Sequence, residues 1–405
     1  MTYAETLAYL YAQLPMFQRI GAAAYKADLG TTWALMEALD HPERDLRCIH
    51  VAGTNGKGST SHLLASTLQE AGYRTGLHTS PHLKDFRERF RINGQMVPEE
   101  LVVDFVTRHR SRLEPLQPSF FEWGVAFTLW WFREQCVDIA VIETGMGGRL
   151  DSTNVVTPEV SVITNIGWDH VQFLGPDLPS IAREKSGIIK AGVPVVIGEA
   201  EGAVADVFKQ VASDQGSPLH FVDQKSPLPH PSALEGAHQV RNARTALAAL
   251  GILQDKGWNL QEEHIARGFQ RVVHNTGLKG RWQVLAEPPL TIADVAHNVD
   301  GIRVIRSLLE CTPYEELHIV LGMVSDKDIS AVLAELPQRA RYYFCKADIP
   351  RGLDAAALKD QAAVHGLRGT VFASVQEAYM AARKAATHND LVLVTGSVFV
   401  VAEVV

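Results

Sequence analysis

Short apolar runs alternate with longer stretches of mixed polarity along most of the chain. Buried strands are predicted at 47–52, 74–79, 137–144, 159–166 and 192–198. Helices are predicted between most of them, at 59–72, 98–113, 121–135 and 177–189. Short strands joined by crossover helices favour a parallel sheet that is covered on both faces. We therefore predict an α/β fold with a mostly parallel sheet.

A second set of apolar runs begins after residue 275 and predicts a second α/β domain. These runs lie at 281–287, 290–296, 317–322, 341–347 and 390–396. The polar, Gly-containing segment 274–280 is the predicted linker, and the Pro-rich segment 214–236 is predicted to be a loop. The chain has 405 residues, whereas single cores rarely grow beyond about 250–300 residues. We predict a larger domain over 1–275 and a smaller, Rossmann-like domain over 281–405.

The composition narrows the possible function classes. A hydrophobic content of 46% and a charged content of 21% are typical of a globular protein and argue against disorder. Because 38 Lys+Arg face 46 Asp+Glu, the net charge of −8 disfavours a nucleic-acid binder that relies on bulk positive charge. The apolar runs are shorter than the roughly 20 residues of a membrane span, and the N-terminus lacks a signal-peptide pattern. We expect a cytoplasmic monomer with no nucleic-acid or membrane partner.

The cysteines form no CxxC pair, which excludes a zinc ribbon and a dithiol redox motif. Scattered cysteines suit a reducing compartment, and each is expected to act as a small buried hydrophobe. They are Cys48, Cys136, Cys311 and Cys345.

The most informative segment is HVAGTNGKGST at 50–60, where a strand leads through glycines into a helix. Such a turn aims backbone N–H groups and a helix N-terminus at one anion, and Lys57 adds a point charge for nucleotide phosphates. The segment departs from a strict GxxxxGK[ST] motif, because position 51 is Val and Gly58 follows Lys57. A glycine turn that binds nothing is the weaker alternative. The predicted phosphate-binding residues are Gly53, Thr54, Asn55, Gly56, Lys57, Gly58, Ser59 and Thr60.

Metal-ligand candidates follow two later strands. Glu143 ends an apolar strand, where ligands collect in open parallel sheets, and a carboxylate there suits Mg²⁺. Capping of a helix or pairing with Arg149 is the structural alternative for Glu143. His170 follows another strand end, so a ligand and a structural histidine are equally plausible from the residues alone. Lys185 lies in a predicted helix and by default is a solvated lysine.

The second domain holds its own candidates at strand-to-helix turns. Asp294 suits a ribose hydroxyl, and His297 suits a substrate carboxylate or amine, although helix capping is the simpler interpretation of both. Arg281 and Ser397 lie at comparable positions, and Thr395-Gly-Ser397 equally suits a tight turn into the last helix.

Taken together, these segments resemble the folylpolyglutamate synthase/dihydrofolate synthase family, a branch of the Mur ligase superfamily. The ordered set is specific although each member alone is weak. In the first domain it comprises HVAGTNGKGST (50–60), TSPHL (79–83), RERFRING (87–94), IETGMGGRLDSTN (142–154), ITNIGWDH (163–170) and AREKSGIIK (182–190). Further along it comprises HQVRNARTAL (238–247), KGRW (279–282), DVAHNVDG (294–301), GMVSDKD (322–328) and TGSVF (395–399).

The resemblance implies an ATP- and Mg²⁺-dependent amide ligase with ATP at the interface of a P-loop-type domain and a glutamate-ligase domain. The γ-phosphoryl group goes to a pterin substrate's carboxylate, and the amine of L-glutamate attacks the acyl phosphate. Two Mg²⁺ sites are implied, one with Ser80 and Glu143 and one with Glu143, His170 and Lys185, the last carbamylated. The implied ATP contacts are Lys57, Asn242, Arg281 and Asp294. The implied substrate contacts are Arg87, Arg89, Thr153, His297 and Ser397, and the implied catalytic set is Lys57, His170, Lys185 and His297.

Several rival functions are weaker. A cell-wall Mur ligase normally carries a nucleotide-sugar domain before the phosphate loop, and the loop here already starts at Gly53. A P-loop regulator has no need of Asp294, His297 and Ser397 together, and an inactive relative is not expected to keep Lys57 and Glu143. We expect a bifunctional enzyme that adds glutamate to dihydropteroate and to reduced folates. The alternatives are a monofunctional folylpolyglutamate synthase and another Mur-type amide ligase.

Overall fold

The computed structural model describes residues 1–14, 28–325 and 329–405. This part of the chain forms two compact units. Unit 1 contains the described residues up to Leu278 except 234–236, and unit 2 contains Leu234–Gly236 and Lys279–Val405. Residues 326–328, which end the GMVSDKD segment, lie outside the described residues. Among the described helices, none is long and apolar enough to cross a membrane.

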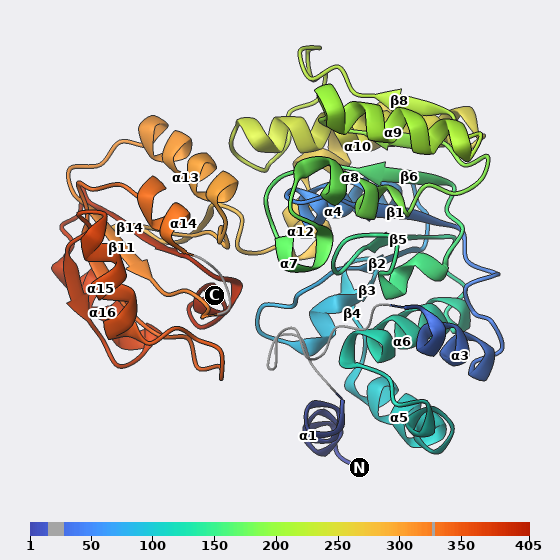
Figure 1. Cartoon of the computed structure of the whole chain (residues 1–405), viewed down its shortest axis with the longest axis horizontal. Coiled ribbons are helices and arrows are strands. Elements are labelled where there is room, and N and C mark those ends of the chain that lie inside the picture. The colour runs from blue at the N-terminus through green and yellow to red at the C-terminus, as the bar shows by residue number, and fades with distance from the viewer. Residues whose placement is uncertain (15–27, 326–328) are drawn as a thin grey trace. The chain divides into compact units, whose positions relative to one another are not determined.

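Unit 1 is built on an eight-stranded sheet with the order β4-β3-β2-β5-β1-β6-β7-β8 (Figure 1). Pairing from β2 through to β8 is parallel, and β3 and β4 add antiparallel strands at one edge. The mostly parallel sheet is therefore confirmed. The strands are β1 (Cys48–Ala52), β2 (Thr75–His78), β3 (Phe90–Ile92), β4 (Gln95–Met96), β5 (Ile139–Glu143), β6 (Val160–Ile163), β7 (Val195–Ile197) and β8 (Leu219–Phe221).

Helices cover both faces of this sheet, and as a result β1 and β5 are buried at every position. Helix α4 packs on β1, β2 and β5, and α10 packs on β6 and β7. The α-helices of unit 1 are α1 (Tyr3–Gln13), α3 (Gly30–Ala38), α4 (Lys57–Glu70), α5 (Glu99–Leu113), α6 (Phe120–Glu134), α7 (Val171–Leu174), α8 (Leu178–Ser186), α9 (Gly202–Asp214), α10 (Ala237–Asp255), α11 (Glu262–Gln270) and α12 (Val272–Thr276). Short 3₁₀ turns are η2 (Phe86–Arg89), η3 (Glu114–Leu116) and η4 (Ser152–Val155).

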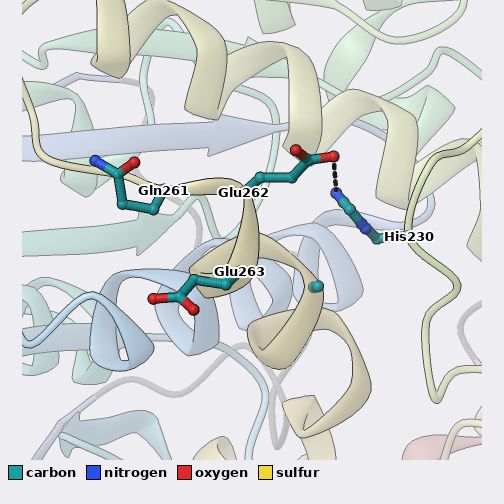
Figure 2. Close-up of a pocket in the computed structure, with 5 residues that line it drawn as sticks. His230, Gln261, Glu262 and Glu263 are labelled. Carbon is teal, nitrogen blue, oxygen red and sulfur yellow. Dashed lines mark ion pairs between the residues drawn. The ribbon is translucent and has the colours of Figure 1, made fainter.

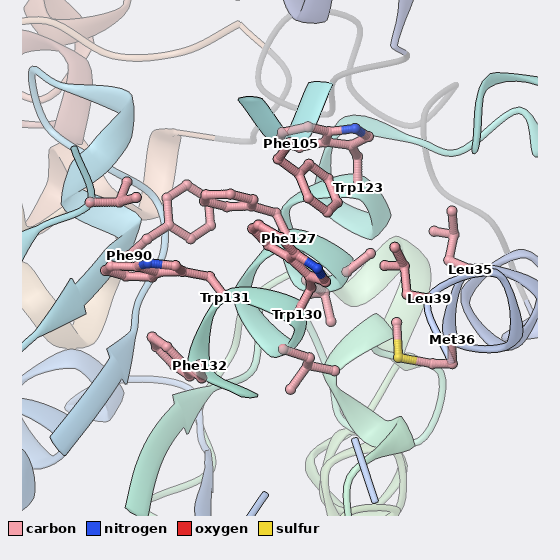
Figure 3. Packing of buried hydrophobic residues seen from close by; sticks show 14 of the residues in the cluster. Leu35, Met36, Leu39, Phe90, Phe105, Trp123, Phe127, Trp130, Trp131 and Phe132 are labelled. Atoms are coloured by element: carbon pink, nitrogen blue, oxygen red, sulfur yellow. The ribbon is translucent and has the colours of Figure 1, made fainter. Parts of the chain in front are cut away.

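An aromatic cluster on α6 forms much of the core of unit 1 (Figure 3). The Phe127 ring stacks with Trp131 at 6.3 Å between centroids and meets Phe105 of α5 edge-on at 5.0 Å. Each buried ring of this size contributes roughly 1.5–3 kcal/mol. The helix begins where Ser119 and Glu122 form a capping box. This packing holds α6 against β2, where the Phe132 ring occupies the space that a Cβ on Gly76 would need.

Unit 2 has a six-stranded sheet with the order β13-β12-β11-β14-β10-β9, in which only β9 is antiparallel among the described strands. Its strands are β9 (Gln283–Ala286), β10 (Leu290–Ala293), β11 (Leu317–Leu321), β12 (Arg341–Phe344), β13 (Gly369–Val371) and β14 (Leu391–Thr395). Its helices are α13 (Val299–Cys311), α14 (Ser330–Glu335), α15 (Ala355–Val364), α16 (Val375–Ala385) and α17 (Val398–Ala402).

Three local predictions differ from the structure wholly or in part. The Pro-rich segment 214–236 contains β8, which pairs with β7. The predicted linker 274–280 contains the boundary between the two units, at Leu278 and Lys279, but its first residues belong to α12, where the buried Thr276 hydroxyl donates to Val272 O and lies 2.7 Å from His62 Nδ1. Cys136 and Cys311 are exposed, so only Cys48 and Cys345 are buried hydrophobes.

Candidate active site

The phosphate loop joins β1 to α4 through two glycines with positive φ. Gly53 has φ +145°, and a Cβ there would lie 1.8 Å from Thr164 Oγ1. Gly56, the N-cap of α4, has φ +81°, and its Cβ would lie 2.2 Å from Asn242 Oδ1. Both positions therefore require glycine for conformation and for space. The predicted ATP contact Asn242 thus lies beside the loop, on α10.

The loop is tied to the segment that follows β6. Thr54 N–H donates to Asn165 O at 2.9 Å, and Asn55 N–H donates to Asn165 Oδ1 at 2.9 Å. The Thr54 hydroxyl accepts from Gly167 N–H at 3.0 Å. These bonds fix the conformation of the loop, with Asn55, Gly56 and Lys57 partly exposed at its rim and Gly58, Ser59 and Thr60 buried in α4.

Two lysines converge on one carbonyl of the loop. Lys57 Nζ donates to Gly53 O at 3.0 Å and to Thr54 O at 3.1 Å, and Lys185 Nζ donates to Gly53 O at 2.8 Å. Lys185 is 4% exposed, so it is not the solvated lysine that helix position alone suggests. Burial, followed by repulsion from Lys57, lowers the pKa of Lys185 to about 7. A large fraction of this amine is consequently neutral near neutral pH.

The predicted metal ligands lie at the carboxyl ends of neighbouring strands. Ser80 follows β2, Glu143 ends β5 and His170 follows β6; β5 and β6 flank β1 in the sheet, and β2 is the next strand beyond β5. The buried Glu143 carboxylate accepts the Ser80 N–H at 3.1 Å. His170 Nε2 lies 3.6 Å from Asp169 Oδ2. Among the described residues, no group of three or more His, Cys, Asp or Glu with ligand atoms within 4.8 Å of one another contains Glu143 or His170, so their metal roles stay predictions.

Thr153 is fully buried within a polar chain that sequence reasoning missed. Its hydroxyl donates to Asp151 Oδ1 at 2.5 Å and lies 2.8 Å from His50 Nε2. Asp151 Oδ2 accepts the Met146 N–H at 2.8 Å, and burial raises the pKa of the Asp151 carboxyl. The chain fixes the loop that follows Glu143. This geometry favours a supporting role for Thr153, whose predicted substrate contact has no exposed surface to use.

The two arginines of the RERFRING segment differ sharply. Arg87 forms ion pairs with Asp85 at 2.7 Å and Glu99 at 3.4 Å, so its charge is satisfied locally. Arg89 is 5% exposed, donates from Nε to His82 Nδ1 at 2.7 Å and lies over the Phe120 ring, but pairs with no carboxylate among the described residues. Burial lowers its pKa to about 10, which leaves it charged at neutral pH. Arg89 is therefore the better candidate for an anionic substrate.

In unit 2, Asp294 anchors its own turn. Its carboxylate accepts Trp282 N–H at 2.8 Å and Ala296 N–H at 2.9 Å, and burial raises its pKa although Arg281 opposes the shift. The Arg281 guanidinium donates to Gly280 O at 3.2 Å. Helix α13 is capped by Asn298, not by Asp294.

His297 and Ser397 lie on neighbouring turns at the carboxyl ends of β10 and β14. Gly396 N–H donates to Ala296 O at 3.1 Å and joins the turns. His297 Nδ1 lies 3.0 Å from Val295 O. Ser397 is 3% exposed and caps α17 by accepting Val400 N–H at 3.1 Å, as the tight-turn alternative expects. The ligand contacts predicted for these residues stay predictions.

A surface hollow of about 500 Å³ lies elsewhere on unit 1, at the start of α11 (Figure 2). His230 pairs there with Glu262 at 3.4 Å, and Gln261 and Glu263 complete its polar rim. It contains none of the predicted site residues.

Comparison with known families matches both parts of the chain. The model of the Mur ligase middle domain matches residues 51–228, and the model of the Mur ligase glutamate ligase domain matches residues 280–398. The dihydrofolate synthase/folylpolyglutamate synthase of Escherichia coli K12 is 36% identical over 370 residues, covering 87% of this chain and 85% of that protein. The Bacillus subtilis 168 protein of the same name is 32% identical and covers 94% of each chain.

Solved structures give the same assignment. Escherichia coli FolC in complex with DHPP and ADP has a TM-score of 0.88 at 32% identity, covering 100% of this chain and 97% of that one. A bifunctional folylpolyglutamate synthase/dihydrofolate synthase with Mn, AMPPNP and L-glutamate bound has a TM-score of 0.85 at 33% identity, with coverage of 100% and 97%. The predicted family and α/β fold class are confirmed: the chain belongs to the folylpolyglutamate synthase/dihydrofolate synthase family of Mur ligases.

Proposed function

We propose that this protein joins L-glutamate to dihydropteroate and to reduced folates in an ATP-dependent, ADP-forming reaction. The observation that carries the proposal is the phosphate loop, whose Gly53 carbonyl binds both Lys57 and Lys185 at the sheet edge where Glu143 ends β5. The names of relatives that cover most of this chain support both activities. The reaction takes small-molecule substrates, and we propose that a cytoplasmic monomer performs it.

The chemistry begins with an unfavourable meeting of two anions. A substrate carboxylate oxygen attacks the γ-phosphorus of ATP and forms a new P–O bond. The bond between the γ-phosphorus and the oxygen that bridges the β- and γ-phosphates breaks, and ADP leaves. Lys57 screens the repulsion, because its Nζ can turn from the loop carbonyls to the phosphates. The neutral amine of glutamate then attacks the acyl carbon: an amide N–C bond forms, the bond from the acyl carbon to the phosphate oxygen breaks, and phosphate leaves together with one proton lost by the amine. Backbone N–H groups at the start of α4 supply further positive potential.

The donor groups on unit 1 fit Mg²⁺. Carboxylate and hydroxyl oxygens are ligands that Mg²⁺ prefers, and Glu143 is a buried carboxylate beside the phosphate loop. We assign Ser80 and Glu143 to one ion and Glu143, His170 and Lys185 to the other. Bound Mg²⁺ neutralises phosphate charge and fixes the in-line geometry of transfer.

Carbamylation would turn the cationic Lys185 side chain into an anionic metal ligand. The side chain is 4% exposed and reaches Gly53 O at 2.8 Å, so its amine lies beside the phosphate loop. Addition of CO₂ to the neutral amine forms an N–C bond and releases one proton. The product is an anionic oxygen ligand, which also removes a buried cation from the side of Lys57.

On the substrate side, Arg89 is the residue that we assign to a carboxylate of the pterin substrate, because its buried charge lacks a carboxylate partner among the described residues. Arg87 serves the fold of the same loop through Asp85 and Glu99. In unit 2 we assign Arg281 and Asp294 to ATP and His297 and Ser397 to the incoming glutamate. We propose functional domains over 1–275 and 281–405.

The deciding assay measures ADP release by purified protein with ATP, Mg²⁺ and L-glutamate, and with dihydropteroate or tetrahydrofolate in turn. We expect glutamate-dependent release with each pterin, and loss of both rates in Lys57→Ala. Lys209→Ala is the matched control, because its 60% exposed side chain pairs with no described residue other than Asp206 on α9. Turnover with one pterin alone removes bifunctionality, and turnover with neither removes the ligase proposal.

A further inference from the structure

A compact set of metal-ligating groups lies in unit 2 at the amino ends of β11 and β14. Asp294 and Ser397 lie at the other end of the strands, after the carboxyl ends of β10 and β14. Glu316, His318 and Asp390 each offer one ligand atom, and these atoms all lie within 4.8 Å of one another. They are brought together by the parallel pairing of β11 with β14, whose amino ends start at Leu317 and Leu391. His318 is fully buried and Asp390 is 3% exposed, whereas Glu316 is half exposed. Two of the three ligands are therefore buried, and the third, Glu316, lies at the protein surface.

The central gap suits a cation better than a hydrogen bond. His318 Nε2 lies 3.6 Å from Asp390 Oδ2, too far for a hydrogen bond, and this buried nitrogen has no hydrogen-bond partner among the described residues. The other ring nitrogen, Nδ1, lies 2.9 Å from the Tyr343 hydroxyl. When Nδ1 donates its proton to Tyr343, the Nε2 lone pair faces a carboxylate oxygen. Two ligands on a tetrahedral ion with bonds of about 2.1 Å are about 3.4 Å apart, which is close to this spacing.

Hydrogen bonds from neighbouring residues fix the orientation of Asp390 and His318, as they do for the ligands of known metal sites. Asp390 accepts Glu316 N–H at 2.9 Å and Thr387 N–H at 2.6 Å, so its carboxylate is fixed by two backbone donors. Tyr343 fixes the orientation of the His318 ring. Ligating histidines characteristically bond their second nitrogen to such a partner, and ligating carboxylates are themselves hydrogen-bonded.

We propose that Glu316, His318 and Asp390 bind a divalent transition-metal ion of the Zn²⁺ class, with water completing the coordination on the exposed side. One imidazole nitrogen and two carboxylate oxygens, at a spacing close to that of ligands on a tetrahedral ion, suit Zn²⁺. Binding requires Glu316 to exchange its ion pair with Arg341, at 2.8 Å, for the metal. Both of those side chains are more than half exposed, so the exchange costs little.

The ion would cross-link the amino ends of β11 and β14, the two central neighbours in the sheet of unit 2. The inference does not depend on ligase activity, because none of the three ligands belongs to the proposed active site. A bound ion stabilises the folded chain in proportion to its affinity and concentration. The site is therefore detectable through binding and through melting temperature.

The test is titration of the chelator-treated full chain with Zn²⁺ in competition with a chromophoric chelator. The background variant His170→Asn removes the histidine of the proposed active-site metal set. We expect one Zn²⁺ equivalent in this background, and at least tenfold weaker binding after Glu316→Gln or His318→Gln. Glu315→Gln is the matched control, since Glu315 neighbours the site but bonds to Asn389 instead. Tyr343→Phe should weaken binding by about tenfold through loss of ring orientation.

Melting in the presence of Zn²⁺ gives an independent measurement. The metal should raise the melting temperature of the background protein and of Glu315→Gln, but not that of Glu316→Gln. Glu316→Gln is the robust variant, because its side chain is 52% exposed and its loss leaves the core intact. Unchanged Zn²⁺ affinity in both ligand variants, or an equal loss in Glu315→Gln, overturns the proposal.

Discussion

Gly56→Ala tests how closely the phosphate loop is fitted to α10. At φ +81° an alanine costs about 1–2 kcal/mol for the left-handed conformation alone. Its Cβ would also lie 2.2 Å from Asn242 Oδ1. Asn242 is 6% exposed and donates to Gln239 Oε1 at 2.9 Å, so moving it breaks a buried hydrogen bond at a further cost of about 1–3 kcal/mol.

The matched control is Gly72→Ala, beyond the opposite end of the same helix. Gly72 has φ +87°, and no atom of the described residues outside its immediate chain neighbours lies within 4 Å of its Cβ position, so this variant carries the conformational cost alone. Thermal unfolding with and without ATP should give a clearly lower melting temperature for Gly56→Ala than for Gly72→Ala, and a smaller ATP-induced rise. The double variant Gly56→Ala/Asn242→Ala should be less destabilised than the sum of its parts. Equal melting temperatures for the two glycine variants, or strict additivity, would refute the proposed fit.

Three further predictions concern individual side chains of unit 1. Arg89→Gln should raise the KM for the pterin substrate at least tenfold, whereas Arg87→Gln should chiefly lower the melting temperature, and steady-state kinetics with the reverse pattern contradicts the assignment. Lys185→Ala should lose activity that added short carboxylates partly restore, and wild-type activity in that variant refutes the carbamate role. Thr153→Val should lower the melting temperature, because it removes the buried hydroxyl that donates to Asp151 Oδ1 and lies 2.8 Å from His50 Nε2, a loss of about 1–3 kcal/mol; an unchanged melting temperature with a raised KM would instead make Thr153 a direct substrate contact.

The central strands were predictable because they are uninterrupted apolar runs. β1, β5 and β11 are buried at all five positions, so burial on both faces is written directly into their composition. Edge strands lack that signal. The outer β8 and β13 each expose two of their three residues, and neither was predicted. The β3–β4 hairpin was also missed, although its Asn93-Gly94 turn is a strong hairpin signal.

Those residues of the candidate site that directly follow a predicted strand could be placed from the sequence. Glu143 and the phosphate loop follow from the rule that ligands collect at carboxyl ends of parallel strands. Lys185 could not, because its burial depends on how α8 packs beside the 145–149 loop, where a Cβ on Gly148 would lie 2.6 Å from Lys185 O. Arg87 and Arg89 look equivalent in sequence, and the structure separates them: Arg87 pairs with Asp85 and Glu99, whereas Arg89 is buried.

The proposed Zn²⁺-class site could not be predicted from the sequence, because its residues are brought together by the pairing of two strands that are far apart in the chain. Glu316 and His318 are separated from Asp390 by more than seventy residues, and no local spacing relates them. The register of β11 on β14, with Leu317 opposite Leu391, sets them side by side. Only a contact between strands carries that information.

The central claim, ligation through an acyl phosphate, is tested most directly by following oxygen. Dihydropteroate labelled with ¹⁸O in its carboxylate is turned over with ATP, Mg²⁺ and L-glutamate, and the phosphate product is analysed by mass spectrometry. Because the attacking carboxylate oxygen stays on phosphorus when the amine displaces phosphate, the account predicts one ¹⁸O atom in each phosphate released. Unlabelled phosphate formed together with the amide product would contradict it.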